Sequence, residues 1–452
     1  MLGYQNGTVE IINKLIDISK MGVQNYANYA NDWLISDDHH IDCEEKKKIL
    51  PRLFEKSSVA LIYGSAGTGK STLINHISRI FSNKRKVFLA QTNPAVDNLF
   101  RKVESKTTDT KFTTIAKFIS GENCQIIGDI IIIVECSTVS NFDMIKILER
   151  ANFKVYILVG DTFQNSSIKF GNWFSIAQKF LPDFSVFELK KPYRSNNSNL
   201  QTLWEKVRTM DDSILDYIAK KQFSTLLDNT IFDSTKNDEI ILCLNYDGLY
   251  GINNINRLLQ ENNTNNPVEW GIHTYNVGDP ILFNDCERFN PVIYNNIKGK
   301  IIDIKLTENK IEFTIEVCKS INGLEIPLNS FELLTCNEPG KSIIKFSVTD
   351  VKNVNSKYST YDLSVVPFQV AYAISIHKAQ GLEYESVKLV ITDEVDERIT
   401  HNIFYTAITR ARTNLKIYWS PEVSNKVVSG LKLRNDAKAI EFLKKLINNK
   451  PN

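Results

Sequence analysis

The stretch that decides the fold is Gly64-Ser65-Ala66-Gly67-Thr68-Gly69-Lys70-Ser71. It fits the pattern G-x-x-x-x-G-K-[S/T], it directly follows the apolar run 59–63, and a helix is expected to begin near Thr72. Glycines let backbone N–H groups close around phosphate oxygens, and a helix N-terminus adds partial positive charge. The pattern therefore predicts a nucleoside triphosphate site, in which Lys70 reaches the β- and γ-phosphates and Ser71 binds Mg²⁺.

Short β-branched runs surround this motif and return late in the chain. The first set lies at 59–63, 87–91, 130–134 and 155–159, and the second set lies at 240–244, 387–391 and 415–419. Runs without polar alternation are typical of strands that are buried on both faces of a parallel sheet. Since longer helical segments separate the runs, the sequence predicts two α/β domains.

A different pattern interrupts the second set. Residues 276–356 show closely spaced β pattern with turn signals at Asn295-Asn296, Asn322-Gly323 and Pro339-Gly340, and little helical periodicity. We expect a small antiparallel barrel inserted into the second α/β domain. The predicted domains are 1–55 (an N-terminal helical segment), 56–183 (the first α/β domain), 184–275 with 357–452 (the second) and 276–356 (the insertion).

Composition limits the class of protein. Among 452 residues, 54 Lys and Arg stand against 52 Asp and Glu, so the net charge is only +2 and any nucleic-acid contact must come from a local basic groove. The seven cysteines have no C-x-x-C spacing and fit a reducing compartment. The longest apolar runs are far below the roughly 20 residues that span a bilayer. We therefore expect a cytoplasmic protein without a membrane partner.

Further segments resemble, in family order, the motifs of superfamily 1 helicases, especially the RecD-like and Upf-like branch. They are 89–99 (similar to motif Ia), 158–164 (motif III), 191–194 (motif IV), 371–383 (motif V) and 404–412 (motif VI). Within the insertion, 277–279 and 294–299 resemble the SH3-like subdomain of that branch. The resemblance implies two RecA-like P-loop NTPase domains with parallel sheets, plus a small SH3-like antiparallel β insertion in the second.

The resemblance also implies an activity. The implied activity is that of an ATP-dependent, Mg²⁺-requiring translocase or helicase, which hydrolyses ATP in the cleft between its two domains and moves along single-stranded nucleic acid. DNA is favoured as that nucleic acid, and RNA stays open as the alternative. Glu135 and Gln164 would hold the attacking water, and Arg194 and Arg410 would bring positive charge to the γ-phosphate. The residues assigned to the nucleotide are Gly64, Ser65, Ala66, Gly67, Thr68, Gly69, Lys70, Ser71, Thr72, Gly381 and Glu383, the last of them at the ribose.

The nucleic-acid residues are also carried over from the resemblance. The backbone of a single strand would lie along side chains of both domains, and its bases would stack on flat side chains. For Trp173 the alternative is a core tryptophan, and for His377 it is an interior histidine. The candidates are Thr92, Asn93, Pro94, Thr113 and Thr114 from the first domain, Trp173 as a stacking platform, and Ser375, His377 and Lys378 from the second domain.

One position departs from the family pattern. Motif II is an Asp-Glu pair at the end of a buried strand, whereas this chain keeps Glu135 and has Val134 in place of the aspartate. Valine has no lone pair to offer a metal ion or its waters. Asp161, at the end of a neighbouring strand, is the predicted substitute as a metal ligand; alternatively, Glu135 turns to the metal.

The departure leaves two activities open. One is a motor with reduced ATP hydrolysis. The other is an ATP-gated clamp that binds nucleic acid, barely hydrolyses ATP and recruits a partner such as a nuclease. Val134 is the residue that keeps the second activity open, and ATPase assays with and without single strands would separate the two.

Overall fold

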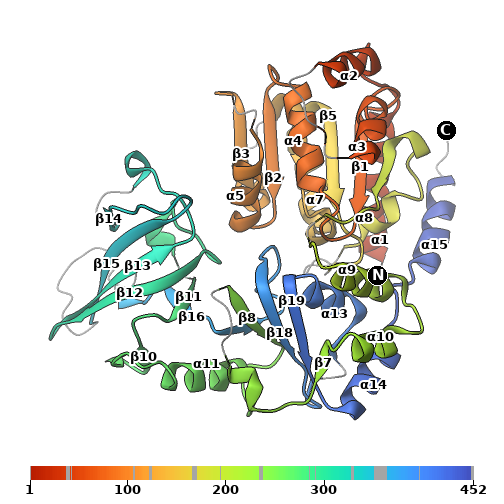
Figure 1. Ribbon diagram of the computed structural model, residues 1–452. Coiled ribbons are helices and arrows are strands. Elements are labelled where there is room, and N and C mark those ends of the chain that lie inside the picture. Colours follow the sequence, from red (N-terminus) through yellow and green to blue (C-terminus); the bar gives the residue numbers. More distant parts are fainter. Residues whose placement is uncertain are drawn as a thin grey trace. The chain divides into compact units, whose positions relative to one another are not determined.

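The protein was analysed as a computed structural model (Figure 1). The structure describes residues 2–36, 41, 43–104, 107–121, 125–164, 171–193, 195–233, 238–284, 286–290, 292–326, 330–350, 364–395 and 398–448. The chain forms two compact units. The first contains Met1–Asp212, Thr400–Thr409 and Leu431–Asn452, and the second contains Ser213–Ile399 and Arg410–Gly430.

The first unit is built on a six-stranded sheet in the order β3-β2-β4-β5-β1-β6, and all neighbouring strands are parallel. Its strands are β1 (Val59–Gly64), β2 (Lys86–Ala90), β3 (Thr110–Thr114), β4 (Ile126–Ile133), β5 (Ala151–Gly160) and β6 (Val186–Leu189). Its helices are α1 (Leu2–Ser19), α2 (Tyr26–Ile35), α3 (Glu44–Ile49), α4 (Lys70–Ile80), α5 (Asn93–Lys102), α6 (Ile115–Ile119), α7 (Asn141–Arg150), α8 (Trp173–Ala177), α9 (Ser198–Thr209), α13 (His401–Ile408) and α15 (Ala437–Asn448), with short 3-10 turns at Leu50–Arg52, Cys136–Thr138 and Asp183–Ser185.

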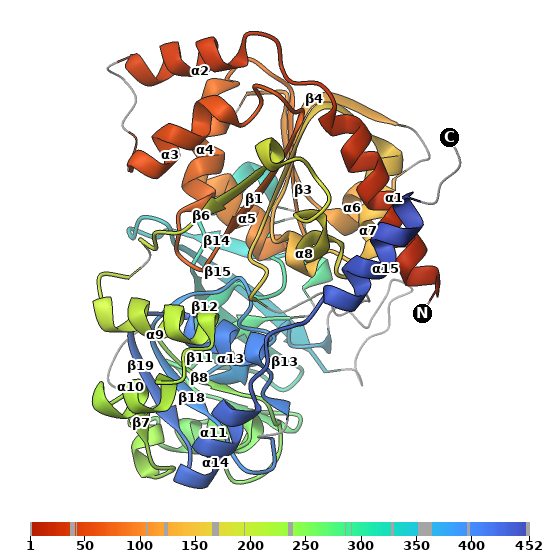
Figure 2. The ribbon, with the colours of Figure 1, turned by 90° about the vertical axis from the view of Figure 1, so that its right-hand side faces the viewer.

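Both faces of this sheet are covered, which explains the continuous apolar runs. Ile62 and Ile132 pack on one face with residues of α4 and α5, while their neighbours Leu61 and Ile131 pack on the other with residues of α1, α6 and α7. Figure 2 shows these helices on the two sides of the sheet. Because successive side chains of a strand point to opposite faces, a strand covered on both faces must be apolar throughout.

The second unit contains a five-stranded parallel sheet in the order β17-β8-β18-β19-β7. Its strands are β7 (Ser224–Thr225), β8 (Glu239–Cys243), β17 (Ala373–Ser375), β18 (Tyr384–Val390) and β19 (Ala411–Tyr418), and its helices are α10 (Ile214–Lys220), α11 (Ile252–Glu261) and α14 (Pro421–Gly430), with a 3-10 turn at Asn229–Phe232. The predicted fold class of two α/β domains with parallel sheets is confirmed.

The predicted β insertion is confirmed as well. It is an antiparallel sheet in the order β14-β15-β13-β12-β11-β16 (Figure 1). Alternate side chains of β13 and β15 are buried around a core of phenylalanines. The strands are β11 (Pro280–Phe283), β12 (Lys298–Leu306), β13 (Lys310–Val317), β14 (Glu332–Leu334), β15 (Ser342–Thr349) and β16 (Phe368–Val370), preceded by the hairpin β9 (Val268–Trp270) and β10 (His273–Tyr275), with 3-10 turns at Glu287–Phe289 and Gly323–Glu325.

Several segments lie outside the domain boundaries expected from the sequence. Strand β6 pairs with β1, so the first unit continues past residue 183. The carboxyl-terminal helix α15 also belongs to the first unit, where Leu443 packs against Ile12 of α1 and Ile176 of α8. The two helices α1 and α15 lie side by side in both views. The sequences of β6 and α15 show that each has an apolar side to bury. They do not show which domain covers that side.

In the part of the chain that the structure describes, none of the helices combines the length and the apolar character that crossing a bilayer requires.

A buried carboxylate fixes the start of the insertion. Asp279 is fully buried, and its two oxygens accept hydrogen bonds from Asn263 Nδ2 (2.9 Å), Tyr372 Oη (2.9 Å), Gln260 Nε2 (2.7 Å) and the backbone N–H of Asn276 (3.0 Å). These donors come from α11, from the chain entering the insertion and from the chain leaving it. Asp279 therefore joins both ends of the insertion to the α/β part of the second unit.

We predict that Asp279→Asn lowers the free energy of unfolding of the second unit by about 2–4 kcal/mol, because an amide nitrogen would face donors inside a buried network. Urea unfolding followed by tryptophan fluorescence measures the loss. Asp303→Asn, on the exposed side of β12, is the matched control and should change stability by about 0.5 kcal/mol or less. Equal effects of the two substitutions would contradict the role of Asp279.

Candidate nucleotide and nucleic-acid sites

The loop between β1 and α4 requires its glycines. Gly67 and Gly69 have φ angles of +79° and +78°, in the left-handed region that favours glycine. A Cβ on Gly69 would also lie 2.4 Å from Lys46 Nζ, and one on Gly64 would lie 2.5 Å from Thr68 Oγ1. The pattern in the sequence thus matches a backbone that other residues could not adopt without rearrangement.

The Lys70 ammonium lies inside this loop. Its Nζ donates hydrogen bonds to the carbonyl oxygens of Gly64 (2.7 Å) and Ser65 (2.9 Å). Ser71 and Thr72 follow in the first turn of α4 and are half-buried. The first N–H groups of a helix have no partner within the helix, so this turn can donate to an anion. Loop, lysine and helix N-terminus together form a cradle suited to phosphate.

Three residues around the loop were not predicted from the sequence. The backbone N–H of Tyr193 donates to the carbonyl of Gly67 (2.6 Å), and the hydroxyl of Tyr405 accepts from the N–H of Ala66 (3.3 Å). Lys46 of α3 is fully buried, with Nζ 5.2 Å from the centre of the Tyr193 ring.

The sequence carried only weak signals for these three residues. Lys46 stands in the charged run Glu44-Glu45-Lys46-Lys47-Lys48, which looks like a solvent-facing helix. Tyr193 and Tyr405 lie inside motifs IV and VI, but the chemistry of those motifs pointed to the arginines Arg194 and Arg410 and gave no role to the tyrosines.

The strand order brings motif II and motif III to the edge that carries the phosphate loop. β5 lies between β1 and β4, with Tyr63 opposite Gly160 and Leu158 opposite Ile133. Asp161 follows β5 directly, so it stands at the carboxyl edge between the phosphate loop and motif II. It is 4% exposed, and its Oδ1 accepts a hydrogen bond from the N–H of Phe163 (3.0 Å).

Motif II has an unusual backbone. Val134 is buried against the core of the first sheet, and its N–H donates to Leu89 O (2.9 Å). Glu135 is half-buried and has a φ of +53°, which costs a non-glycine residue about 1 kcal/mol. Its carbonyl accepts from both N–H and Oγ1 of Thr138, each at 2.8 Å. Strain held at a candidate site is an observation that points to function.

Helix α13 holds the motif III loop. The Gln164 carbonyl accepts from Asn402 Nδ2 (2.6 Å), and the Phe163 ring packs against His401 and Tyr405. Burial lowers the pKa of His401, and the nearby charge of Asp161 opposes this shift only in part. Hydrogen bonds with Val207 and Asn402 also oppose the lowering of the His401 pKa, but burial has the larger effect.

In the second unit the structure brings together the residues predicted from motifs V and VI. Gly381 has a φ of +80°. The carbonyl of Leu382 accepts from Arg410 Nη1 (3.1 Å), and the N–H of Tyr384 donates to Arg410 O (3.0 Å). Arg410 is 2% exposed. Glu383 is half-buried in the same segment, whereas Arg194, from motif IV, lies outside the described residues.

The predicted nucleic-acid residues of the first unit share one edge of its sheet. Thr92 accepts a hydrogen bond from Ala95 N–H at the start of α5, and Thr114 accepts one from Lys117 N–H at the start of α6. The strands preceding them, β2 and β3, are neighbours. Asn93 is exposed, Pro94 is half-buried and Thr113 is buried. The two threonine hydroxyls thus act as helix caps, and the exposed side chain of Asn93 beside Thr92 is accessible to a ligand.

In the second unit, Ser375 ends β17 and is buried, with its Oγ accepting from Lys378 N–H (3.2 Å). His377 is exposed, so the alternative of an interior histidine is wrong. The Lys378 ammonium donates to Gln369 Oε1 on β16 of the insertion. These three residues lie within one turn of chain at the carboxyl end of β17.

Trp173 requires a correction. Its side chain is fully buried, and its indole N–H donates to Val139 O (2.9 Å). A stacking platform needs an exposed ring face, so the prediction of base stacking is wrong and the alternative of a core tryptophan is correct. The Trp173 and Phe174 rings both belong to the apolar core on one face of the first sheet.

The residues present fit Mg²⁺ in a nucleotide site. Among the described residues, no group of three His, Cys, Asp or Glu side chains could hold a metal ion. Mg²⁺ at such sites is usually bound by one or two carboxylates together with phosphate oxygens and waters. The hydroxyl of Ser71 and the carboxylate of Asp161 supply the required oxygen chemistry at the edge that carries the phosphate loop.

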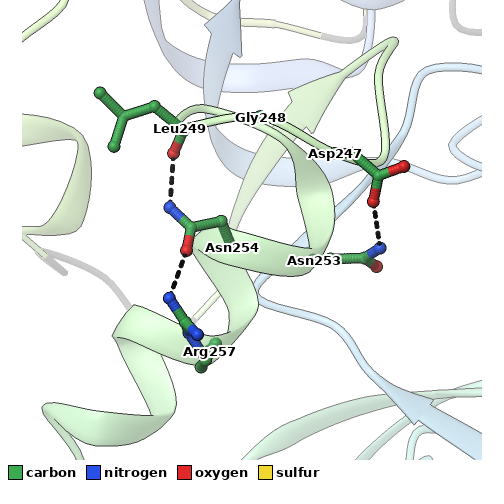
Figure 3. Close-up of a pocket in the computed structure, with 6 residues that line it drawn as sticks. All are labelled: Asp247, Gly248, Leu249, Asn253, Asn254 and Arg257. Carbon is green, nitrogen blue, oxygen red and sulfur yellow. Dashed lines mark hydrogen bonds between the residues drawn. The ribbon is translucent and has the colours of Figure 1, made fainter.

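A separate cavity of about 530 Å³ opens in the second unit (Figure 3). It lies where the chain passes from β8 into α11. It is lined by Asp247, Gly248, Leu249, Asn253, Asn254 and Arg257. None of the predicted site residues lines this cavity.

Two family models match the chain. The model of an AAA domain matches residues 44–226, and the model of a UvrD-like helicase C-terminal domain matches residues 370–418. The first match contains the phosphate loop and the motif III segment, and the second contains the segments of motifs V and VI.

Curated relatives align along most of the chain. It is 25% identical to the ATP-dependent DNA helicase Pif1 of Campylobacter jejuni, over 87% of this chain and 97% of that protein. It is 24% identical to the RecBCD enzyme subunit RecD of Buchnera aphidicola, over 82% of this chain and 67% of that protein. An uncharacterised protein of Methanocaldococcus jannaschii is 24% identical, and this chain spans 39% of its length.

Solved structures share the fold. The Pif1 helicase of Candida albicans superposes with a TM-score of 0.53 at 18% identity, over 91% of this chain and 100% of that one. Pif1 from Bacteroides bound to single-stranded DNA gives 0.53 at 16% identity, over 91% and 99%. Its complex with ADP-AlF3 and single-stranded DNA gives 0.52 at 17% identity, over 91% and 98%.

The fold and the motifs define a P-loop protein with two RecA-like α/β domains. The sequence matches are narrower and agree with the resemblance to superfamily 1 helicases: the chain is similar to helicases of the RecD-like and Pif1-like group.

The shape of the phosphate loop can be tested at Gly69. We predict that Gly69→Ala weakens binding of a fluorescent ADP analogue at least about tenfold, because the new methyl group meets Lys46 and the positive φ is strained. Gly271→Ala is the matched control: its φ is +63° and no atom lies within 4 Å of the added Cβ. Unchanged ADP affinity in Gly69→Ala would show that the loop does not bind phosphate.

Proposed function

We propose that this chain is an ATP-dependent translocase or helicase that moves along single-stranded DNA and couples ATP hydrolysis between its two α/β domains to that movement. The observation that carries the proposal is the carboxyl edge of the first sheet. There the phosphate loop, Asp161 and Glu135 follow three neighbouring strands, β1, β5 and β4, at the same edge of the sheet.

Binding of the triphosphate is assigned to residues Gly64 to Thr72. The backbone N–H groups of the loop and of the first turn of α4 would donate to phosphate oxygens, and Lys70 would move from the carbonyls of Gly64 and Ser65 to the β- and γ-phosphates. Gly381 and Glu383 of the second domain would complete the site, with Glu383 at the ribose.

Mg²⁺ is assigned to Ser71 and Asp161. When bound, the ion neutralises charge on the phosphate oxygens as it develops. Asp161 is suited to this position because its burial and its hydrogen bond from Phe163 fix the carboxylate at the edge of the sheet. With Val134 next to Glu135, Asp161 is the carboxylate on the neighbouring strand that can replace the missing aspartate.

Hydrolysis is assigned to four residues. Glu135 would accept the proton of the attacking water and Gln164 would orient that water, while Arg194 and Arg410 would stabilise charge on the γ-phosphate. The contact of Arg410 with Leu382 O involves Nη1, and a guanidinium has five N–H donors, so Arg410 can keep this contact and act on the phosphate. The closing of the two domains on ATP would bring the γ-phosphate to the guanidinium.

Single-stranded DNA is the proposed nucleic acid. Support comes from the DNA helicase relative and from the Bacteroides neighbour with bound single-stranded DNA. Backbone contact is assigned to Thr92, Asn93, Pro94, Thr113 and Thr114 in the first unit and to Ser375, His377 and Lys378 in the second. A cytoplasmic location and a protein partner such as a nuclease stay predictions.

The first experiment is an ATPase assay with single-stranded DNA, single-stranded RNA or no nucleic acid. A DNA motor should hydrolyse ATP much faster with DNA than with RNA or alone, and Lys70→Ala should abolish the activity in all three conditions. Equal stimulation by RNA would change the assigned substrate. Turnover that ignores nucleic acid would contradict the proposed function.

Val134 favours a second candidate, an ATP-gated clamp that binds DNA, barely hydrolyses ATP and recruits a partner. The side chain is buried and offers no oxygen at the position where the family has a carboxylate. DNA binding that depends on ATP but proceeds without turnover would support this candidate over the motor.

The effect of this position can be measured directly. We predict that Val134→Asp raises the turnover number for ATP and lowers the Mg²⁺ concentration needed for half-maximal activity, because a carboxylate would return beside Glu135. Val134→Asn, which is nearly isosteric with aspartate but uncharged, is the control and should not reproduce the gain. If Val134→Asp changes neither quantity, the valine is irrelevant to the metal.

A further inference from the structure

We propose that Lys298, on strand β12 of the insertion, is a positioning residue for Arg410 and so links the insertion to ATP turnover. The inference rests on the proposed function, because it requires Arg410 to act on the triphosphate. It concerns a residue of the SH3-like segment 294–299, outside motifs Ia to VI, that lies more than 80 positions from its partner Glu383 in motif V.

The Lys298 ammonium has partners outside its own sheet. Its Nζ donates to the carbonyl of Glu383 (2.6 Å) and to Asp238 Oδ1 (3.0 Å), and it lies 3.5 Å from the centre of the Tyr384 ring. Only 26% of the side chain is exposed. Burial lowers the pKa of Lys298, and the charge of Asp238 opposes that shift. A lysine of the insertion is thus fixed to the α/β part of the second unit.

Its partner Glu383 is the middle residue of the segment that holds Arg410. On one side, Leu382 accepts the hydrogen bond from the Arg410 guanidinium; on the other, Tyr384 donates its N–H to the Arg410 carbonyl. Both the side chain and the backbone of Arg410 therefore depend on where this three-residue segment lies. Lys298 fixes the segment through its central carbonyl.

Lys298 is also connected to the chain that follows Arg410, through Asp238. Asp238 accepts from Lys298 through Oδ1, and through Oδ2 it accepts from Arg412 Nη2 (2.6 Å) and from the N–H of Glu385 (3.1 Å). Arg412 stands two residues after Arg410. Asp238 and Lys298 thus connect the start of β18 with the start of β19, the strand that begins directly after Arg410.

The chemistry explains why a cation is needed at this position. One ammonium can donate to a carbonyl and a carboxylate and also lie over an aromatic ring, three interactions that no apolar side chain can make together. Removing the charge would leave Glu383 O and one oxygen of Asp238 without this donor. Arg410 would then occupy its productive orientation less often. Nucleotide affinity would fall much less than turnover, because the phosphate loop belongs to the other unit and the disturbed segment contributes only the ribose contact of Glu383.

The test compares Lys298→Met with Lys300→Met, a matched control because Lys300 is exposed on the same strand. With saturating single-stranded DNA, Lys298→Met should lower kcat for ATP about tenfold, whereas KM for ATP and affinity for fluorescent ADP stay within about twofold. Lys300→Met should behave as wild type. Unchanged kcat in Lys298→Met, or a matching loss of ADP affinity, would overturn the proposal.

A double-substitution cycle separates positioning from a general structural effect. If Lys298 acts through Arg410, Lys298→Met should cause no further loss of kcat in an Arg410→Ala background. Additive losses would overturn the proposal. Should Lys298→Met fail to fold, Lys298→Gln keeps a donor for Glu383 O and should give the same non-additivity with a smaller loss of kcat.

The outcome is distinct from a failure of the proposed function. Wild-type protein without DNA-stimulated hydrolysis would overturn the function itself and the coupling with it. Normal stimulation in the wild type, combined with an unaffected Lys298→Met variant, would overturn only the coupling.

Discussion

The backbone of the loop between β1 and α4 is the constraint on which the rest of the first unit depends. Phosphate can be cradled only if successive N–H groups turn inward, and that turn needs left-handed backbone at Gly67 and Gly69. The parallel order β4-β5-β1 then brings Glu135 and Asp161 to the same edge. A carboxylate on the neighbouring strand can thereby stand in for the aspartate that Val134 replaces.

In the second unit, the buried Arg410 must be held in position and still be able to contact a phosphate oxygen. Arg410 is held by backbone groups of the segment Leu382 to Tyr384, and Lys298 and Asp238 hold that segment in turn. A guanidinium has five N–H donors, so Arg410 can keep its contact with Leu382 O and still donate to a charged phosphate oxygen. Because Lys298 lies on the insertion, we infer that the insertion influences turnover through this network.

The sequence was sufficient to predict features that local pattern determines. The phosphate loop and the parallel strands follow from glycine spacing and continuous apolar runs. Contacts between distant segments could not be predicted: Lys46 and Lys298 look like surface lysines, and α15 shows an apolar stripe without showing that α1 covers it. Trp173 was assigned wrongly because a tryptophan beside a loop looks the same in sequence whether it stacks on a base or packs on a sheet.

The central claim is that Lys70 and Arg410 act on one triphosphate. The most direct measurement is a crystal structure of the chain with single-stranded DNA, Mg²⁺ and ADP–aluminium fluoride. The account predicts the Arg410 guanidinium within about 3 Å of a fluoride or phosphate oxygen that Lys70 also contacts. A fluoride or phosphate oxygen that Lys70 contacts but no N–H group of Arg410 reaches would contradict it.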